Sequence, residues 1–113
     1  MSAIKALKQN VEFHRVYSRG KSVASSRLVS YALKSKNDGC RVGITTSKKL
    51  GTAVERNRCR RVIRAAYRSI SDEIDGNWDI VFVARFKTKT SKTPVIEQTM
   101  RDQLIQLGVI KQG

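Results

Sequence analysis

The segment between residues 56 and 68 carries six arginines, and their spacing matches one face of a helix. At about 100° per residue in a helix over residues 53–70, most of them share one arc, while Arg56 lies off that arc toward the helix start. Arginine presents a planar fork of N–H donors that fits phosphate oxygens and base edges, so the pattern indicates recognition of a polyanion. The shared arc comprises Asn57, Arg58, Arg60, Arg61, Arg64 and Arg68.

Such an arc could also be a charged face that is merely solvated, or it could belong to a helix that lies on a membrane surface. Glu55 is the only acid between Arg41 and Arg68, and like charges three or four residues apart destabilise an isolated helix, which argues against mere solvation. The opposite, apolar arc is small and is needed for the core, which leaves little to insert into lipid. We therefore favour a nucleic-acid face. The apolar arc comprises Cys59, Val62, Ile63, Ala66, Tyr67 and Ile70.

Catalysis by the protein itself is not predicted. A protein nuclease usually needs clustered carboxylates for metal ions or a histidine in an acid–base pair. His14 is the only histidine, and we expect it at the surface or in contact with RNA. The nine acids are scattered, and Asp72, Glu73 and Asp75 fall in a polar segment that should be solvated. No G-x-x-x-x-G-K phosphate loop is present, so we expect no catalytic residue, no metal ligand and no cofactor in the protein.

Composition supports a polyanion partner. The chain has 113 residues and a formal net charge of +14, which predicts a single domain over residues 1–113 with a strong positive field, for which nucleic acid is the usual partner. Cys40 and Cys59 form no C-x-x-C motif, and we expect both to be reduced thiols. No apolar run reaches the roughly 20 residues of a membrane span, and the first residues lack a signal-peptide pattern, so we expect a cytoplasmic protein.

The remaining pattern predicts the elements that position the arginine helix. A short helix is expected over residues 10–18, capped by Asn10. Strand-like alternation follows in residues 22–35, strongest at 28–33, and the Asn37-Asp38-Gly39 turn predicts a hairpin with a strand over 41–46. A strand is expected over 78–86 and a final helix from Thr93, as N-cap, to about 107. The predicted fold is α+β, an α-β-β-β-α-β-α two-layer sandwich.

Residues 41–68 (RVGITTSKKLGTAVERNRCRRVIRAAYR) resemble the signature of the bacterial ribonuclease P protein component family. That signature joins a strand, a Ser-Lys-Lys loop and a helix with Arg-Asn-Arg, Arg-Arg and a further Arg. The resemblance extends upstream through residues 10–22 and downstream to Trp78-Asp79-Ile80-Val81 and Ala84-Arg85, so it covers most of the chain. It implies a ribosomal-protein-like fold with a left-handed β-α-β crossover, which pattern alone would not predict because such connections are almost always right-handed.

The resemblance also implies a division of labour. In the family the RNA subunit carries out the Mg²⁺-dependent removal of the 5′ leader from precursor tRNA, and the protein holds the catalytic RNA and the leader. The leader would lie in a cleft between the first helix and the sheet, against Phe13, Tyr17 and Tyr31. The catalytic RNA would contact Lys48, Lys49, Arg56, Asn57, Arg58, Arg60, Arg61, Arg64 and Arg68.

Physical reasoning leaves alternatives open for several of these residues. Phe13 and Tyr17 share a helix face and could stack on unpaired bases, but aromatics four residues apart are often ordinary core residues. Tyr31 could be core or cleft, and Lys48 and Lys49 could be merely solvated.

Two further matters concern function and the charged residues around the helix. A structural RNA-binding protein, such as a ribosomal protein, is the alternative function. Glu55 is expected to act as a first-turn helix acid, and the basic loop with Lys87, Lys89 and Lys92 receives no role.

Overall fold

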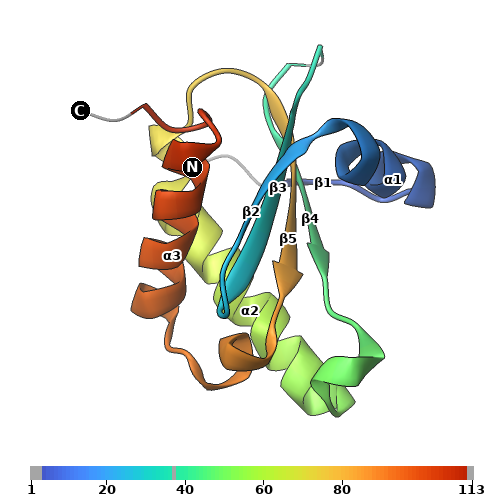
Figure 1. Cartoon of the computed structure of the whole chain (residues 1–113), viewed down its shortest axis with the longest axis vertical. Coiled ribbons are helices and arrows are strands. Elements are labelled where there is room, and N and C mark those ends of the chain that lie inside the picture. The colour runs from blue at the N-terminus through green and yellow to red at the C-terminus, as the bar shows by residue number, and fades with distance from the viewer. Residues whose placement is uncertain (1–3, 37, 112–113) are drawn as a thin grey trace.

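The computed structural model of the protein describes residues 4–36 and 38–111 (Figure 1). In these residues a five-stranded sheet has the strand order β1-β4-β5-β3-β2. The strands are β1 Lys5–Ala6, β2 Lys21–Ala24, β3 Leu28–Lys34, β4 Arg41–Thr45 and β5 Trp78–Ala84. The helices are α1 Asn10–Arg19, α2 Ala53–Ile70 and α3 Thr93–Gln106, with 3₁₀ turns η1 Lys48–Leu50, η2 Ser71–Glu73 and η3 Phe86–Thr90.

The centre of the sheet is β5, and this position overturns the predicted hairpin. β3 pairs with β5 in antiparallel register, from Leu28 opposite Ala84 to Lys34 opposite Trp78, while β4 pairs with β5 in parallel. β3 and β4 are therefore not neighbours, although Gly39 does adopt a turn conformation with φ of 79°. The physical reason is the apolar run of β5, whose side chains are buried on both faces. Its backbone N–H and C=O groups are then shielded from water too, and they pair with a strand on either side. Asn37 lies outside the described residues.

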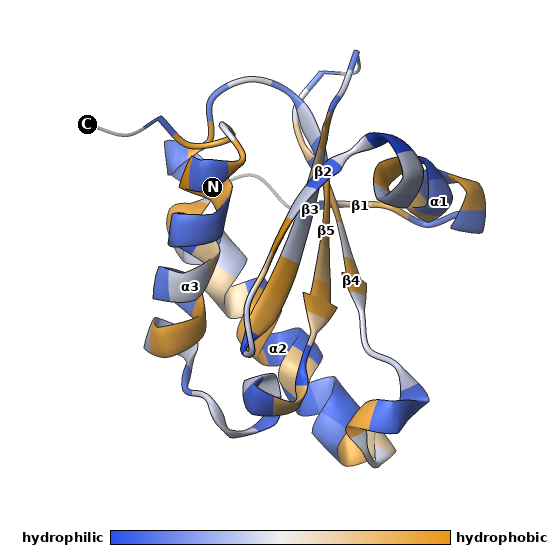
Figure 2. Ribbon diagram, viewed as in Figure 1, coloured by the Kyte–Doolittle hydropathy of each residue, from blue (hydrophilic) through white to orange (hydrophobic). Residues whose placement is uncertain are grey.

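Helices cover both faces of this sheet. α2 and α3 pack side by side on one face over the main core, which includes Leu28, Ile63, Phe82 and Met100 (Figure 1). α1 lies on the other face, where Val16 and Val81 form a smaller cluster. The α+β class is thus confirmed, and α1 adds a partial third layer to the two layers that were expected. Figure 2 shows the hydrophobic strands between these helices.

The connection from β4 through α2 to β5 joins two parallel neighbouring strands, so it is a β-α-β crossover. The left-handedness of this crossover stays a prediction. α2 has the bounds that its arginine spacing predicts, and all six residues of the predicted apolar arc are buried. The apolar contacts of this arc fix the rotation of the helix, and they leave Arg61, Arg64 and Arg68 exposed.

Other boundaries differ from prediction by a residue or two. α1 is capped by Gln9 and α3 by Lys92, rather than by Asn10 and Thr93, which are the first helical residues. β5 ends at Ala84 because the next residues turn into η3. The two-residue strand β1 was not predicted, since it is too short to show an alternating pattern.

Candidate nucleic-acid interface

The start of α2 is stabilised by a reciprocal pair of hydrogen bonds. Thr52 Oγ1 accepts from the N–H of Glu55 at 3.2 Å, and the Glu55 carboxylate accepts from the N–H of Thr52 at 2.9 Å. The pKa of Glu55 is lowered, first by this backbone N–H and then by Lys89, whose Nζ lies 3.3 Å from the carboxylate. The predicted first-turn role of Glu55 is confirmed, and its charge is balanced within the protein.

The exposed face of α2 carries four of the predicted RNA-binding side chains: Asn57, Arg61, Arg64 and Arg68. No hydrogen bond or ion pair joins the guanidinium groups of Arg61, Arg64 and Arg68 to another of the described residues. Asn57, Arg61 and Arg64 line a hollow of about 490 Å³ together with Val54 and Arg60. This outer arginine face, defined here as Arg61, Arg64 and Arg68, therefore presents unneutralised guanidinium groups to solvent. Lys48 and Lys49 are exposed on η1, just before α2.

Arg58 lies on the same predicted arc but turns toward η3. Its guanidinium donates to the carbonyl oxygens of Lys89 at 2.7 Å, Ser91 at 3.2 Å and Thr88 at 3.4 Å. These bonds hold the η3 loop against α2, which is a structural role that the sequence did not indicate. An RNA contact for Arg58 stays a prediction.

Two further arginines of α2 are half-buried. Arg60 donates to the carbonyl oxygen of Ile44 on β4 at 3.3 Å, so it points toward the sheet edge and α1. Arg56 has a buried Nε without a hydrogen-bond partner among the described residues. The predicted arc is therefore divided. Asn57, Arg61, Arg64 and Arg68 are exposed, whereas Arg58 and Arg60 donate to backbone carbonyl oxygens of the protein.

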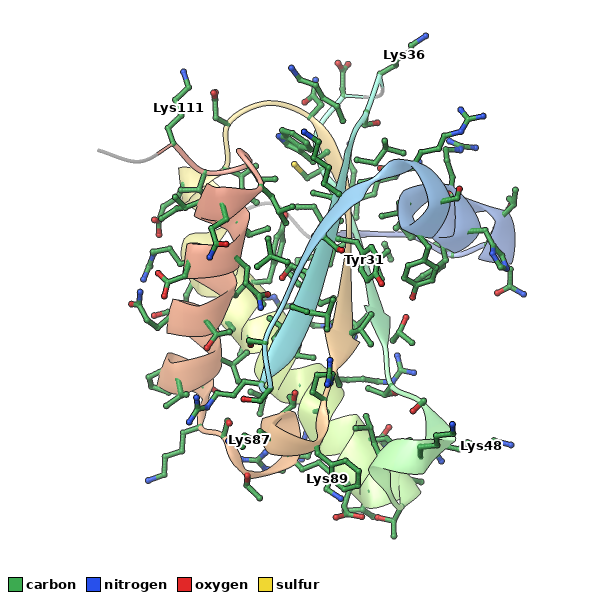
Figure 3. All side chains as sticks on the ribbon, viewed as in Figure 1. Tyr31, Lys36, Lys48, Lys87, Lys89 and Lys111 are labelled. Atoms are coloured by element: carbon green, nitrogen blue, oxygen red, sulfur yellow. The ribbon has the colours of Figure 1, made fainter. Side chains whose placement is uncertain are left out.

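A cleft between α1 and the end of β4 brings together the predicted aromatic residues. Phe13 and Tyr17 line a hollow of about 330 Å³, with Arg60 at its edge. Tyr17 is fixed by a 2.8 Å hydrogen bond between its hydroxyl and Thr45 Oγ1. Its ring packs edge-on against Tyr31, with centroids 4.9 Å apart, on the α1 side of the sheet (Figure 3). Tyr31 therefore supports Tyr17 and does not itself line the hollow.

Phe13 approaches the sheet so closely that only glycine fits beneath it. A Cβ at Gly43 would lie 2.4 Å from Cε1 of Phe13, well inside van der Waals contact. Sequence reasoning did not use Gly43, although a glycine within a strand is a sign of close approach by another group. The half-buried Phe13 thus belongs both to the cleft and to the packing of α1.

Beside this cleft, a charge network that sequence reasoning missed ties α1 to the sheet. Arg41 on β4 donates to Asp79 on β5 through Nε at 3.0 Å and Nη2 at 2.9 Å, and its Nη1 pairs with Glu12 on α1. The Asp79 side chain is only 6% exposed. The pKa of Glu12 is lowered, first by the backbone N–H groups of Gln9 and Lys8 and further by Arg41. Nothing in the sequence around Arg41 or around Asp79 indicates that these two side chains form an ion pair.

The other flank of α1 forms a second groove, of about 710 Å³, between the helix and the end of β3. It contains four cations: Arg15 and Arg19 from α1, and Lys34 and Lys36 from the end of β3 and the residues after it. This basic flank was not predicted, because its residues are close only after α1 crosses the sheet.

Residues 4–36 and 38–111 contain no group of three or more His, Cys, Asp or Glu side chains that could hold a metal ion. Glu73 forms a two-point ion pair with Arg101 of α3 at 2.9 Å, and Asp75 lies 3.2 Å from Lys111. Of the two thiols, Cys59 is buried and Cys40 is half-buried, and both are free. Within the same described ranges, no helix is long and apolar enough to cross a bilayer.

Comparison with known proteins decides what this surface belongs to. The family described as Ribonuclease P matches residues 1–108. The chain belongs to the ribonuclease P protein family. The ribonuclease P protein component of Clostridioides difficile is 46% identical over 99 residues, covering 87% of each chain, and that of Clostridium novyi is 43% identical over 105 residues, covering 91% of this chain and 93% of the other.

Solved structures agree with the family assignment. The RNase P protein of Staphylococcus aureus matches with a TM-score of 0.84 and 34% identity, over 96% of this chain and 100% of that one. The RNase P protein of Thermotoga maritima, at 24% identity, shares the fold with a TM-score of 0.79 over 96% of this chain and 99% of that one. The chain is therefore a protein subunit of ribonuclease P, the ribonucleoprotein that removes the 5′ leader from precursor tRNA, and it associates with ribonuclease P RNA. This assignment favours the ribonuclease P hypothesis over the ribosomal-protein alternative.

Proposed function

We propose that the subunit uses two separate surfaces, one for each RNA. The outer arginine face of α2, with the exposed Lys48 and Lys49 before it, binds the catalytic RNA. The cleft between α1 and β4 receives the single-stranded leader of precursor tRNA. Arg56, Arg58 and Arg60 of the predicted set act at the edges of these surfaces, where they also contact or pack on protein.

The observation that carries the proposal is the composition of the cleft. Phe13 and Tyr17 offer ring surface and Arg60 offers a cation in one hollow. An unpaired base can stack on an aromatic ring whatever its identity, with a free energy of about 1–3 kcal/mol, while a guanidinium holds the phosphate. Such a cleft binds leaders of different sequence, which a subunit acting on many precursors requires.

Chemistry is assigned to the RNA subunit. The described acids are scattered or ion-paired, so the protein is proposed to position the leader without contributing a catalytic group. The Mg²⁺ ions required for cleavage would be held by the RNA, and the protein itself would need no cofactor. We place this activity in the cytoplasm, where precursor tRNA is made.

Reconstitution tests the general proposal. The full chain is added to ribonuclease P RNA at low Mg²⁺, and cleavage of a precursor tRNA is followed over time. We expect the protein to stimulate cleavage, because its cations reduce phosphate repulsion between the two RNAs. Absence of stimulation, with the protein shown to be folded, would contradict the proposal.

The cleft has its own test. Phe13→Ala combined with Tyr17→Ala should lower the affinity of the holoenzyme for precursor tRNA and leave the affinity for mature tRNA, which lacks a leader, nearly unchanged. Val11→Ala is the matched control, because Val11 lies on the same helix, is 59% exposed and does not line the cleft. Equal losses for precursor and mature tRNA would refute the assignment, provided that circular dichroism shows both variants to be folded.

A further inference from the structure

We propose that the η3 loop carries a third RNA contact, in which the ring of Phe86 stacks on an unpaired base. The inference deepens the proposed function, since it requires that the outer arginine face docks an RNA beside this loop. It also assigns a role to the basic loop around Lys87, Lys89 and Lys92, which the sequence left without one.

Phe86 is exposed in a way that folding does not explain. Phe86 is 68% exposed, and it alone is exposed among the described phenylalanine, tyrosine and tryptophan residues. The ammonium of Lys89 lies 4.8 Å from the ring centroid, over one face of the ring. A cation on one face orients the ring through its quadrupole and leaves the opposite face available.

The loop that bears this ring is held rigidly. Arg58 donates to three of its carbonyl oxygens, and the buried Thr88 accepts from the N–H of Arg85 at 2.9 Å and donates to the carbonyl of Arg27. Lys89 is itself anchored, since Nζ donates to the carbonyl of Leu50 at 2.6 Å. An exposed ring on a fixed loop loses little entropy on binding, which is the general advantage of a pre-organised site.

The charges around Phe86 identify the kind of partner. Arg85 and Lys87 are exposed on either side of it in sequence, and the nearby Glu55 is already paired with Lys89. Lys87 and Lys89 appear at the same end of the molecule as Lys48 (Figure 3). A partner with flat apolar faces and dense negative charge satisfies both features, and unpaired RNA has that chemistry, whereas an apolar protein segment would leave the cations unpaired.

A fluorescence experiment tests stacking directly. Phe86→Trp is made in the full chain, ribonuclease P RNA is added, and precursor tRNA is added afterwards. Stacking should quench the introduced indole, in excess of any change of Trp78 in the wild-type protein. Quenching by the first RNA would locate the base in the catalytic RNA, and quenching only after the second would locate it in the precursor. No excess quenching at either step, with both RNAs bound, would overturn the proposal.

An affinity series supplies the second readout. Phe86→Ala should weaken RNA binding about thirtyfold, the mid-range for one stacked base. Phe86→Leu should weaken it similarly, because leucine has no flat π face, while Phe86→Tyr should stay within about twofold of wild type on the same argument. Wild-type affinity for Phe86→Leu would mean a merely apolar contact and would overturn the inference, as would wild-type affinity for Phe86→Ala.

Failure of this inference is separable from failure of the proposed function. Val95→Ala, an exposed apolar residue of α3, is the matched control and should bind as wild type. If the Phe86 variants bind normally while variants of the outer arginine face bind weakly, stacking is wrong and the docking face stands. If the arginine variants also bind normally, the docking face is wrong as well.

Discussion

The aromatic cleft and the outer arginine face differ in how far their residues also hold the protein together. In the cleft, Phe13 rests on Gly43 and Tyr17 bonds Thr45, with the Arg41 network alongside. On the outer face, the guanidinium groups form no hydrogen bond or ion pair with another described residue. The cleft is therefore fixed in shape before a leader arrives, whereas the arginine face supplies charge on long side chains that can adjust to an RNA surface. Substitutions in the cleft should therefore lower stability, whereas substitutions on the outer arginine face should change binding with little change in stability.

The largest effect is expected beside the cleft. Arg41→Met should lower the free energy of unfolding by about 3 kcal/mol, because it leaves the buried Asp79 carboxylate unpaired. Urea unfolding followed by circular dichroism measures this loss. The double variant Arg41→Met with Asp79→Asn should recover part of it, since the unpaired charge is gone. A loss below about 1 kcal/mol is typical of exposed ion pairs. It would show that Arg41 contributes no more to stability than the outer arginines do, and it would contradict the difference drawn between the two regions.

Substitution of Arg58 should give the next largest effect. Arg58 lies on the predicted arginine arc, but its guanidinium is bonded to the η3 loop, so it tests the distinction between arginines that hold the protein together and arginines that are free to bind RNA. Arg58→Ala should cost about 2 kcal/mol of stability through the lost charged hydrogen bonds to η3. Hydrogen exchange should become faster at the amides of residues 86–91. Arg61→Ala is the control on the same helix, and an equal effect of the two substitutions on thermal unfolding would contradict the assignment.

The outer face should show the opposite behaviour. Arg61→Ala with Arg64→Ala should change stability by no more than about 0.5 kcal/mol, because both side chains are exposed. The salt dependence of binding to ribonuclease P RNA should fall by about one unit of log–log slope for each phosphate contact removed. Lys111→Ala, a cation beyond α3 that is 82% exposed, is the control. An unchanged slope in the double variant would remove this face from the RNA interface.

The smallest effect is expected for Tyr17→Phe, which removes the hydroxyl of Tyr17 and keeps its ring. Tyr17→Phe should cost about 1 kcal/mol of stability by deleting the bond to Thr45. Preference for precursor over mature tRNA should persist, because the ring that stacks remains. Binding of both tRNAs by fluorescence anisotropy would test this, and loss of the preference would show that the hydroxyl reads the leader.

Local pattern in the sequence was enough to predict α2. Its bounds and its buried arc follow from helical periodicity, because the apolar residues must meet the sheet whatever the rest of the chain does. The same periodicity could not distinguish Arg58 from Arg61, since the partners of Arg58 are backbone carbonyls some 30 residues away, which have no sequence signature. The family resemblance, rather than pattern, brought Phe13, Tyr17 and Tyr31 together.

Strand order was the harder problem. A turn signal between two strand-like segments normally predicts a hairpin; here Gly39 has a positive φ, as in a turn, but another strand lies between the two segments. The continuous apolar run of β5 predicted a strand, but nothing local states where that strand lies in the sheet or which strands lie beside it. Pairing between residues distant in sequence, such as Arg41 with Asp79, depends on that order and could not be predicted without it.

The central place of β5 also bears on how the protein is made. β3 and β4 emerge from the ribosome well before residues 78–84, and neither has its inner partner until that last strand appears. The arginine helix, too, is synthesised before the strand that completes the sheet beneath it. Completion of the sheet must therefore wait until residues 78–84 have been made, and it must then close contacts such as Leu28 with Ala84, which favours slow folding. Until then a nascent chain of this positive charge is exposed to ribosomal RNA, a polyanion that attracts it.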